Sequence, residues 1–329
     1  MRMMHNLFWK VLILCSVLIS GIMQHCAAMN EAPIAYTIYG KELIVHPISK
    51  LLEEYKKVKE LGFGTYGKVF LMHNKEKNIS IALKISSDIS LVKEAIFLQM
   101  LKGNERIVQS YGIFYKDVNE KRIFCLALEY APNGTLLELM DKLCENCQYI
   151  KESELREYAK QIMEALIALN KIKIMHLDLK PSNIVLTKDN KIKIIDFGVA
   201  QMYEGKDLDK SGINDYIKSI PIKDTGFQKF YAPETGVYYS KSPYGIGLNA
   251  DLWSFGHLLY SLVDRTMDFP IPFNDARTEI IVPFPCNDTG WKSMSKELKD
   301  LIKNLLVYNP DKRLSLEQIK NHPWFGMNK

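Results

Sequence analysis

The sequence predicts an α+β fold in which a small antiparallel sheet with one main helix is followed by a larger helical lobe. Short apolar runs typical of strands dominate the chain between about residues 55 and 130. Apolar residues at helical spacing dominate it from about 131 to 325. A chain of 329 residues is long enough for both lobes, and we expect a small-ligand site between them.

The expected elements follow in order along the chain. Strands are predicted over residues 56–61, 69–73, 79–85 and 123–129. A helix is predicted over 91–101, with Ile96, Met100 and Leu101 on one face and Lys93 and Gln99 on the other. After Asn133, helices are predicted over 152–170, 252–263 and 295–306.

The first residues are different in kind from the rest. Residues 11–23 form an apolar run after Arg2 and Lys10, and Ala27 and Ala28 are small residues suited to cleavage. About thirteen apolar residues are too few to span a bilayer, so residues 1–28 are predicted to be a signal peptide, with an uncleaved anchor as the alternative. Residues 29–54, which contain Pro33 and Pro47, are predicted to be a leader or linker.

Composition narrows the possible partners. The hydrophobic content of 47% and the charged content of 25% are ordinary for a globular protein. The net charge of +5 is small and scattered, which favours a solvated surface over a nucleic-acid partner. With the signal peptide cleaved, we expect no stable membrane association. Cys144 and Cys147 form an isolated C-x-x-C that could pair in an oxidising compartment or remain two thiols.

A glycine-rich segment, LGFGTYGKVF, contains Gly62, Gly64 and Gly67 between two predicted strands. Glycines let backbone N–H groups approach phosphate oxygens closely. A dinucleotide-binding loop requires a helix directly after the third glycine, whereas Lys68 and Val69 continue as strand.

Six further residues carry chemistry. Lys84 ends a predicted strand, and Glu94 on the following helix is a candidate partner. In IMHLDLKPSNIVL, one short loop can present Asp178, Lys180 and Asn183. Asp196 follows another apolar run, and a buried carboxylate there needs a partner such as a divalent cation. Asn183 and Asp196 would supply the oxygen ligands that Mg²⁺ prefers.

The order of these motifs resembles the eukaryotic protein kinase family, serine/threonine branch, over residues 55–325. Further matches are YAPE at 231–234, DLWSFG at 251–256 and NPDKR at 309–313. The resemblance implies a lobe of about 55–130 and a lobe of about 131–325, and a kinase that uses ATP and Mg²⁺ on a protein substrate of unknown identity.

The resemblance also implies roles for individual residues. Asp178 would accept the proton of the substrate hydroxyl, Lys180 would neutralise the transferring phosphoryl group, and Asn183 and Asp196 would bind magnesium. Glu234 and Arg313 would form a buried structural ion pair. The nucleotide site would consist of Leu61, Gly62, Gly64, Gly67, Val69, Ala82, Lys84, Glu94, Leu128, Glu129, Ala131 and Val185.

The sequence departs from the family at two places. Leu177 replaces the arginine that usually meets a phosphorylated activation segment, and Ser90 and Gln201 are also neutral, so we expect activity without that phosphorylation. Phe227 replaces a threonine that usually hydrogen-bonds the catalytic aspartate and lysine, a role that Thr225 could take over.

Two alternatives to a protein kinase remain open at this point. A pseudokinase that binds nucleotide and regulates another protein is compatible with Leu177 and Phe227. A lipid or small-molecule kinase is disfavoured by the YAPE and DLWSFG segments. A signal peptide together with ATP chemistry favours a kinase of the secretory pathway or a secreted effector kinase that is delivered into another cell. Asn78, Asn133 and Asn287 fit the acceptor pattern for N-glycosylation, and whether they are glycosylated stays open.

Overall fold

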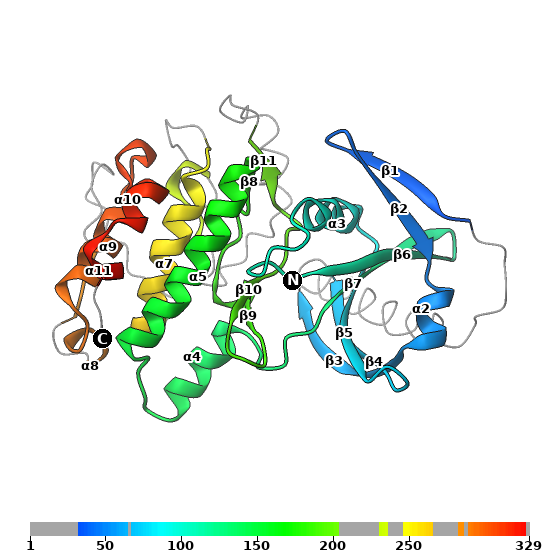
Figure 1. The fold of residues 1–329 in the computed structure, drawn as a ribbon, viewed down its shortest axis with the longest axis horizontal. Helices are drawn as coiled ribbons and strands as arrows, with labels where there is room; N and C mark the ends of the chain where they lie inside the picture. Colours follow the sequence, from blue (N-terminus) through cyan, green and yellow to red (C-terminus); the bar gives the residue numbers. More distant parts are fainter. Residues whose placement is uncertain are drawn as a thin grey trace, which may run out of the picture. The chain divides into compact units, whose positions relative to one another are not determined.

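The structure is a computed structural model that describes residues 32–64, 67–203, 230–235, 246–265, 282–285 and 289–326. These residues belong to two compact units (Figure 1). The first unit contains the chain up to Met100 together with Gln109–Tyr130. The second contains Leu101–Val108 and the chain from Ala131 onward.

The first unit is built on a seven-stranded sheet with the strand order β1-β2-β6-β7-β5-β4-β3. The pairs are antiparallel, apart from the parallel pair of β2 and β6. This confirms the antiparallel sheet that the sequence predicts. The strands are β1 (Ile34–Ile38), β2 (Lys41–Pro47), β3 (Lys56–Gly64), β4 (Gly67–Asn74), β5 (Ile79–Ser86), β6 (Ser110–Val118) and β7 (Lys121–Glu129).

Helix α3 (Ser90–Met100) is the main helix of this unit, as predicted. Its buried side chains include Ile96 and Phe97, whereas Gln99 is exposed and Lys93 is half-buried. The helix packs against strands β1, β2, β6 and β7. The apolar face read from the sequence is therefore the face that covers the sheet.

Residues 32–54 differ from the leader or linker that the sequence predicts. They form β1, β2 and the short helix α2 (Ser49–Glu54), all part of the first unit. The N–H of Ile48 donates to the carbonyl of Tyr115 at 3.0 Å, directly after the parallel pairing of β2 with β6. Pro47 ends the strand, so it excludes a long helix without preventing the strand. Strand β6, which pairs with β2, lies more than sixty residues further along the chain. Local sequence patterns do not reveal a pairing at that distance.

The second unit is mainly helical, which confirms the predicted helical lobe (Figure 1). The three predicted helices are present as α5, α7 and α9. Short two-stranded sheets pair β9 with β10 and β8 with β11. The elements are α4 (Leu136–Glu145), α5 (Glu152–Lys171), β8 (Ile174–Met175), β9 (Ile184–Leu186), β10 (Ile192–Ile194), β11 (Gln201–Met202), α7 (Ala250–Asp264), α8 (Thr289–Lys292), α9 (Lys296–Leu305), α10 (Leu316–Lys320) and α11 (Pro323–Gly326).

Helix α7 is the buried centre of the second unit, and its side chains from Ala250 to Val263 are all buried. It approaches α9 closely at Gly256, where an added Cβ would lie 2.7 Å from the Cβ of Leu305. A larger residue at Gly256 would push the two helices apart. Among the helices that the structure describes, none combines the length and the apolar character needed to cross a bilayer.

Candidate active site

A glycine-rich hairpin joins β3 to β4 in the first unit. Gly62 and Gly64 lie on β3, and Gly67 begins β4 opposite Gly64. A Cβ added at Gly67 would lie 1.9 Å from the carbonyl oxygen of Ile85, and φ at this residue is +136°. Only glycine fits there. Since a strand and not a helix follows, the hairpin differs from a dinucleotide-binding loop, as the sequence predicts.

One face of the sheet carries the other predicted nucleotide residues of this unit. Ala82 and Lys84 are two positions apart on β5, so their side chains point to the same face. Val69 is opposite Lys84 on β4, and Leu128 is opposite Ala82 on β7, which places both on that face too. Glu129 ends β7. Leu61, on β3, is 36% exposed.

Lys84 and Glu94 form the predicted ion pair. The Nζ of Lys84 lies 2.8 Å from the Oε2 of Glu94, and the two residues are 7% and 0% exposed. A buried ammonium and a buried carboxylate are costly to desolvate, so each needs the other. The pair fixes the lysine on the face that Val69 and Ala82 share.

In the second unit, the segment from His176 to Asn183 is anchored by Asp251 at the start of α7. The Asp251 carboxylate accepts the N–H of His176 at 2.7 Å and the N–H of Leu177 at 2.8 Å. Burial raises the pKa of Asp251, and the neighbouring His176 together with the two N–H donors opposes that shift. Leu177 has a φ of 62°, a left-handed conformation that a leucine adopts only where the surroundings impose it.

The Asp178 carboxylate lies at the centre of this segment and is 7% exposed. Its Oδ1 accepts from the Lys180 ammonium at 2.9 Å and from the Tyr231 hydroxyl at 3.0 Å. Its Oδ2 accepts from the Asn183 amide at 2.8 Å. The structure thus brings the three predicted catalytic residues together in one network. Donors on both oxygens fix the orientation of the carboxylate.

Asn183 and Asp196 have the chemistry of a magnesium site. The Asn183 Nδ2 donates both to the Asp178 carbonyl and to its carboxylate, each at 2.8 Å, so the amide nitrogen is committed and the amide oxygen is oriented away. Asp196 has a φ of 66°, and the preceding Ile195 donates its N–H to the Asn183 carbonyl at 3.0 Å. A carboxylate and an amide oxygen held this way fit the ligand preference of Mg²⁺.

Ala131 and Val185 also belong to the second unit. Val185 lies on β9 and forms an isolated bridge with Thr135, and the N–H of Leu186 donates to the carbonyl of Gly134 at 2.8 Å. These contacts tie β9 to the segment that follows Ala131. The places of both residues in the nucleotide site stay predictions.

Two polar residues that hold this site together, Asp251 and Tyr231, were not predicted as site residues from the sequence. Asp251 had a signal in the sequence, since it is an acidic residue at the start of an almost wholly apolar helix. Tyr231 had none, because its hydroxyl reaches a residue 53 positions earlier in the chain. Phe227 and Thr225 lie outside the described residues, as do residues 1–28, so what was expected of them stays a prediction.

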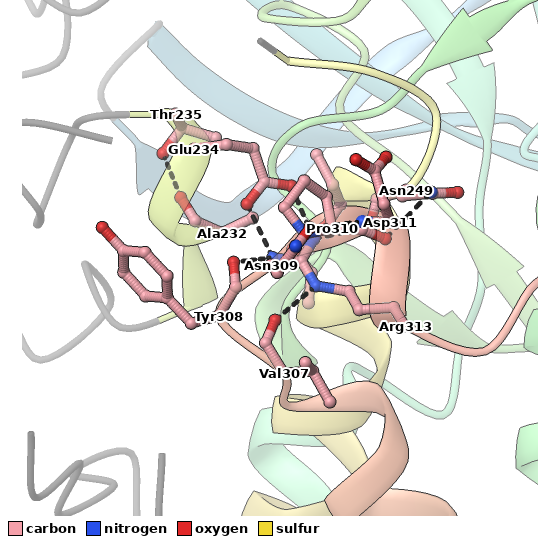
Figure 2. A network of polar contacts seen from close by, with 12 residues as sticks. Ala232, Glu234, Thr235, Asn249, Val307, Tyr308, Asn309, Pro310, Asp311 and Arg313 are labelled. Carbon is pink, nitrogen blue, oxygen red and sulfur yellow. Dashed lines mark hydrogen bonds and ion pairs between the residues drawn. The ribbon is translucent and has the colours of Figure 1, made fainter. Parts of the chain in front are cut away.

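Directly after Tyr231, the chain is fixed by the Glu234–Arg313 pair that the sequence predicts (Figure 2). Both side chains are 0% exposed, and the pair is bidentate, with N···O distances of 2.5 and 2.6 Å. Arg313 also donates to the carbonyls of Val307, Asn249 and Tyr308. The 3₁₀ turn η3 (Pro233–Thr235) is thereby held against the helical core.

Asp178 is a carboxylate base with a lysine beside it and hard oxygen ligands next to it, and such a set of groups can carry out phosphoryl transfer. A strand-rich lobe followed by a helical lobe is the two-lobed architecture of protein kinases. A family model described as "Protein kinase domain" matches residues 55–325. The chain therefore belongs to the protein kinase domain family.

Curated proteins similar to this chain are kinases. The chain is 30% identical over 298 residues to the serine/threonine-protein kinase PKH1 of Saccharomyces cerevisiae, covering 86% of this chain and 37% of that protein. It is 32% identical over 295 residues to 3-phosphoinositide-dependent protein kinase B of Dictyostelium discoideum, covering 85% and 29%. It is 28% identical over 290 residues to an Aurora kinase of Candida glabrata, covering 84% and 72%. The chain thus spans well under half the length of the first two relatives.

Proposed function

We propose that this chain is a serine/threonine protein kinase that uses ATP and Mg²⁺ to phosphorylate a protein. The observation that carries the proposal is the Asp178 carboxylate, which is buried, oriented by donors on both oxygens and flanked by Lys180. Family membership and the names of the relatives support the same reaction. The serine/threonine preference rests on Lys180 in DLKPSN and on those names.

Each residue has a defined task in this proposal. Asp178 orients the substrate hydroxyl and takes its proton, and Lys180 balances negative charge on the transferring group. Lys84, fixed by Glu94, binds phosphate oxygens. Asn183 and Asp196 hold the metal, which when bound supplies positive charge to the phosphates. Positioning and charge neutralisation account for most of the rate in this chemistry.

The test compares purified protein with its Asp178→Asn variant in phosphate transfer from labelled ATP and Mg²⁺ to a generic protein substrate. We expect the variant to lose activity by about three orders of magnitude or more, since the base is removed and the amide keeps the shape. Asp189→Asn, at an exposed turn before β10, is the matched control and keeps parental activity. Phosphoamino-acid analysis of the product identifies the hydroxyl that is modified.

The competing function is a pseudokinase that binds nucleotide and regulates a partner, which Leu177 and Phe227 keep open. In that case neither the parent nor Asp178→Asn would transfer phosphate, while both would still bind ATP when binding is measured by calorimetry. Intact Lys84, Glu94, Asp178, Asn183 and Asp196 favour the enzyme.

The proposal includes entry into the secretory pathway, which rests on the apolar run of residues 11–23 and the small residues at 26–28. Residues 1–28 fused to a reporter enzyme should direct it into the medium of expressing cells, with cleavage after Ala28 read by N-terminal sequencing. Retention of the uncleaved fusion inside the cells would contradict this part of the proposal.

A further inference from the structure

The hydroxyl of Tyr231 reaches the carboxylate of Asp178. The O–H donates to Oδ1 at 3.0 Å, and the two residues are 9% and 7% exposed. A hydrogen bond to a buried charged group is among the stronger ones in proteins, because solvent does not compete for the acceptor. The contact is therefore large enough to influence how Asp178 is oriented.

The backbone around Tyr231 is fixed on both sides. Before it, the carbonyl of Phe230 accepts from the Ser254 hydroxyl on α7 at 2.7 Å, and the Phe230 ring packs on His257 with centroids 4.0 Å apart. After it, Thr235 closes the turn by two hydrogen bonds to the Ala232 carbonyl. A phenol has only two side-chain torsions, so a fixed backbone leaves its hydroxyl little freedom.

The other donors to Asp178 differ from this one. Lys180 has a long side chain with several rotatable bonds, and in the proposed mechanism its ammonium turns toward the transferring phosphoryl group. Asn183 donates to Oδ2, and its amide oxygen would hold the metal in the proposed mechanism. Tyr231 is the donor that Oδ1 keeps when Lys180 turns away.

We infer that Tyr231 is a positioning residue for Asp178, which deepens the proposed function and rests on it. Its hydroxyl holds Oδ1 and thereby fixes the orientation of the carboxylate toward the substrate hydroxyl. Relatives in this family usually have a threonine at position 227 that hydrogen-bonds the catalytic aspartate, whereas this chain has Phe227. Tyr231, four residues further along, makes that hydrogen bond instead. The sequence alone offered Thr225 for that role.

The first experiment measures kcat and KM for Tyr231→Phe, which removes only the hydroxyl. We expect kcat to fall about ten- to one-hundred-fold, as for loss of a hydrogen bond to a charged group, with KM for ATP unchanged. Tyr158→Phe is the matched control, because its hydroxyl donates to Glu154 at 2.8 Å on helix α5, away from Asp178. That variant should keep parental kcat while its melting temperature reports the cost of a lost tyrosine hydroxyl.

A second experiment separates positioning from a general structural role. If Tyr231 acts through Asp178, adding Tyr231→Phe to Asp178→Asn changes kcat by less than about twofold, because the carboxylate it orients is gone. A further ten-fold loss in that background would place its action elsewhere and overturn the inference.

The outcomes distinguish this inference from the proposed function. Parental kcat in Tyr231→Phe, together with an inactive Asp178→Asn, would refute the inference and leave the kinase intact. A loss of kcat in Thr225→Ala with none in Tyr231→Phe would assign the role to Thr225 and also refute it. A parent that transfers no phosphate would overturn both.

Discussion

Arg313 is a residue whose whole hydrogen-bonding capacity is used inside the protein. A guanidinium has five N–H groups, and here they meet the Glu234 carboxylate and three backbone carbonyls, while its carbon lies 5.3 Å from the centre of the Trp253 ring. A buried ion pair repays its desolvation only when such partners are present. The pair therefore specifies one arrangement of the turn η3, which directly follows Tyr231.

Arg313→Ala should lower the free energy of unfolding by about 3–5 kcal/mol, because Glu234 is left buried and without its partner. The matched control is Arg122→Ala, since Arg122 makes a bidentate pair with Asp117 at an exposed site and its loss should cost about 1 kcal/mol or less. Urea unfolding monitored by circular dichroism gives both values. Equal costs for the two variants would contradict this account of the buried pair.

At the scale of elements, the hairpin of β1 and β2 extends the sheet and packs against α3, the helix that carries Glu94. Tyr39 at the hairpin turn contacts the Phe97 ring on α3, with centroids 5.6 Å apart. Behind β2, Ile48, Leu51 and Leu52 join the core beneath β4 and β5. The segment that precedes the kinase family match is thus part of the folded unit.

Ile48→Ala should therefore lower the free energy of unfolding by about 2–5 kcal/mol, because the side chain is 1% exposed in that core. Ile44→Ala is the same substitution four residues earlier at a position that is 42% exposed, and it should cost about 0.5 kcal/mol or less. Thermal or urea unfolding of the two variants checks the comparison. If neither variant differs from the parent, residues 32–54 behave as a leader after all.

At the scale of the whole molecule, we propose that activity is independent of phosphorylation of the activation segment. Leu177 is 4% exposed and apolar, so this position offers no cation to a phosphate. Instead, the loop that holds Asp178 is anchored from within by Asp251, through hydrogen bonds of 2.7 and 2.8 Å. These two hydrogen bonds form here without a phosphate, which supports the proposal.

We expect kcat to stay within about threefold of the parent when Ser211, Tyr216 and Ser219 are replaced together by alanine or phenylalanine. Thr225→Ala is tested separately and in combination with these substitutions, with the same expected result. These residues lie outside the described part of the chain. Phosphatase treatment of the parent, followed by mass spectrometry and a kinetic assay, gives an independent measurement. A folded variant without activity would show that a phosphate is required.

Much of this site could be predicted from the sequence because its residues occur in short motifs, close to one another along the chain. Gly62, Gly64 and Gly67 are spaced for one hairpin, Asp178, Lys180 and Asn183 for one loop, and Lys84 and Glu94 are close in the chain. Such spacing is set by strand and loop geometry, so the order of motifs indicates the fold and the chemistry together.

The sequence by itself determined the two-lobed α+β fold, the ion pair of Lys84 with Glu94 and the cluster around Asp178. Only the tertiary structure decided that residues 32–54 belong to the first unit and that Tyr231 and Asp251 reach the loop of Asp178. The physical reason is the distance along the chain. Local periodicity reports how a segment folds, whereas a pairing across 53 or 75 residues is created only when the core assembles.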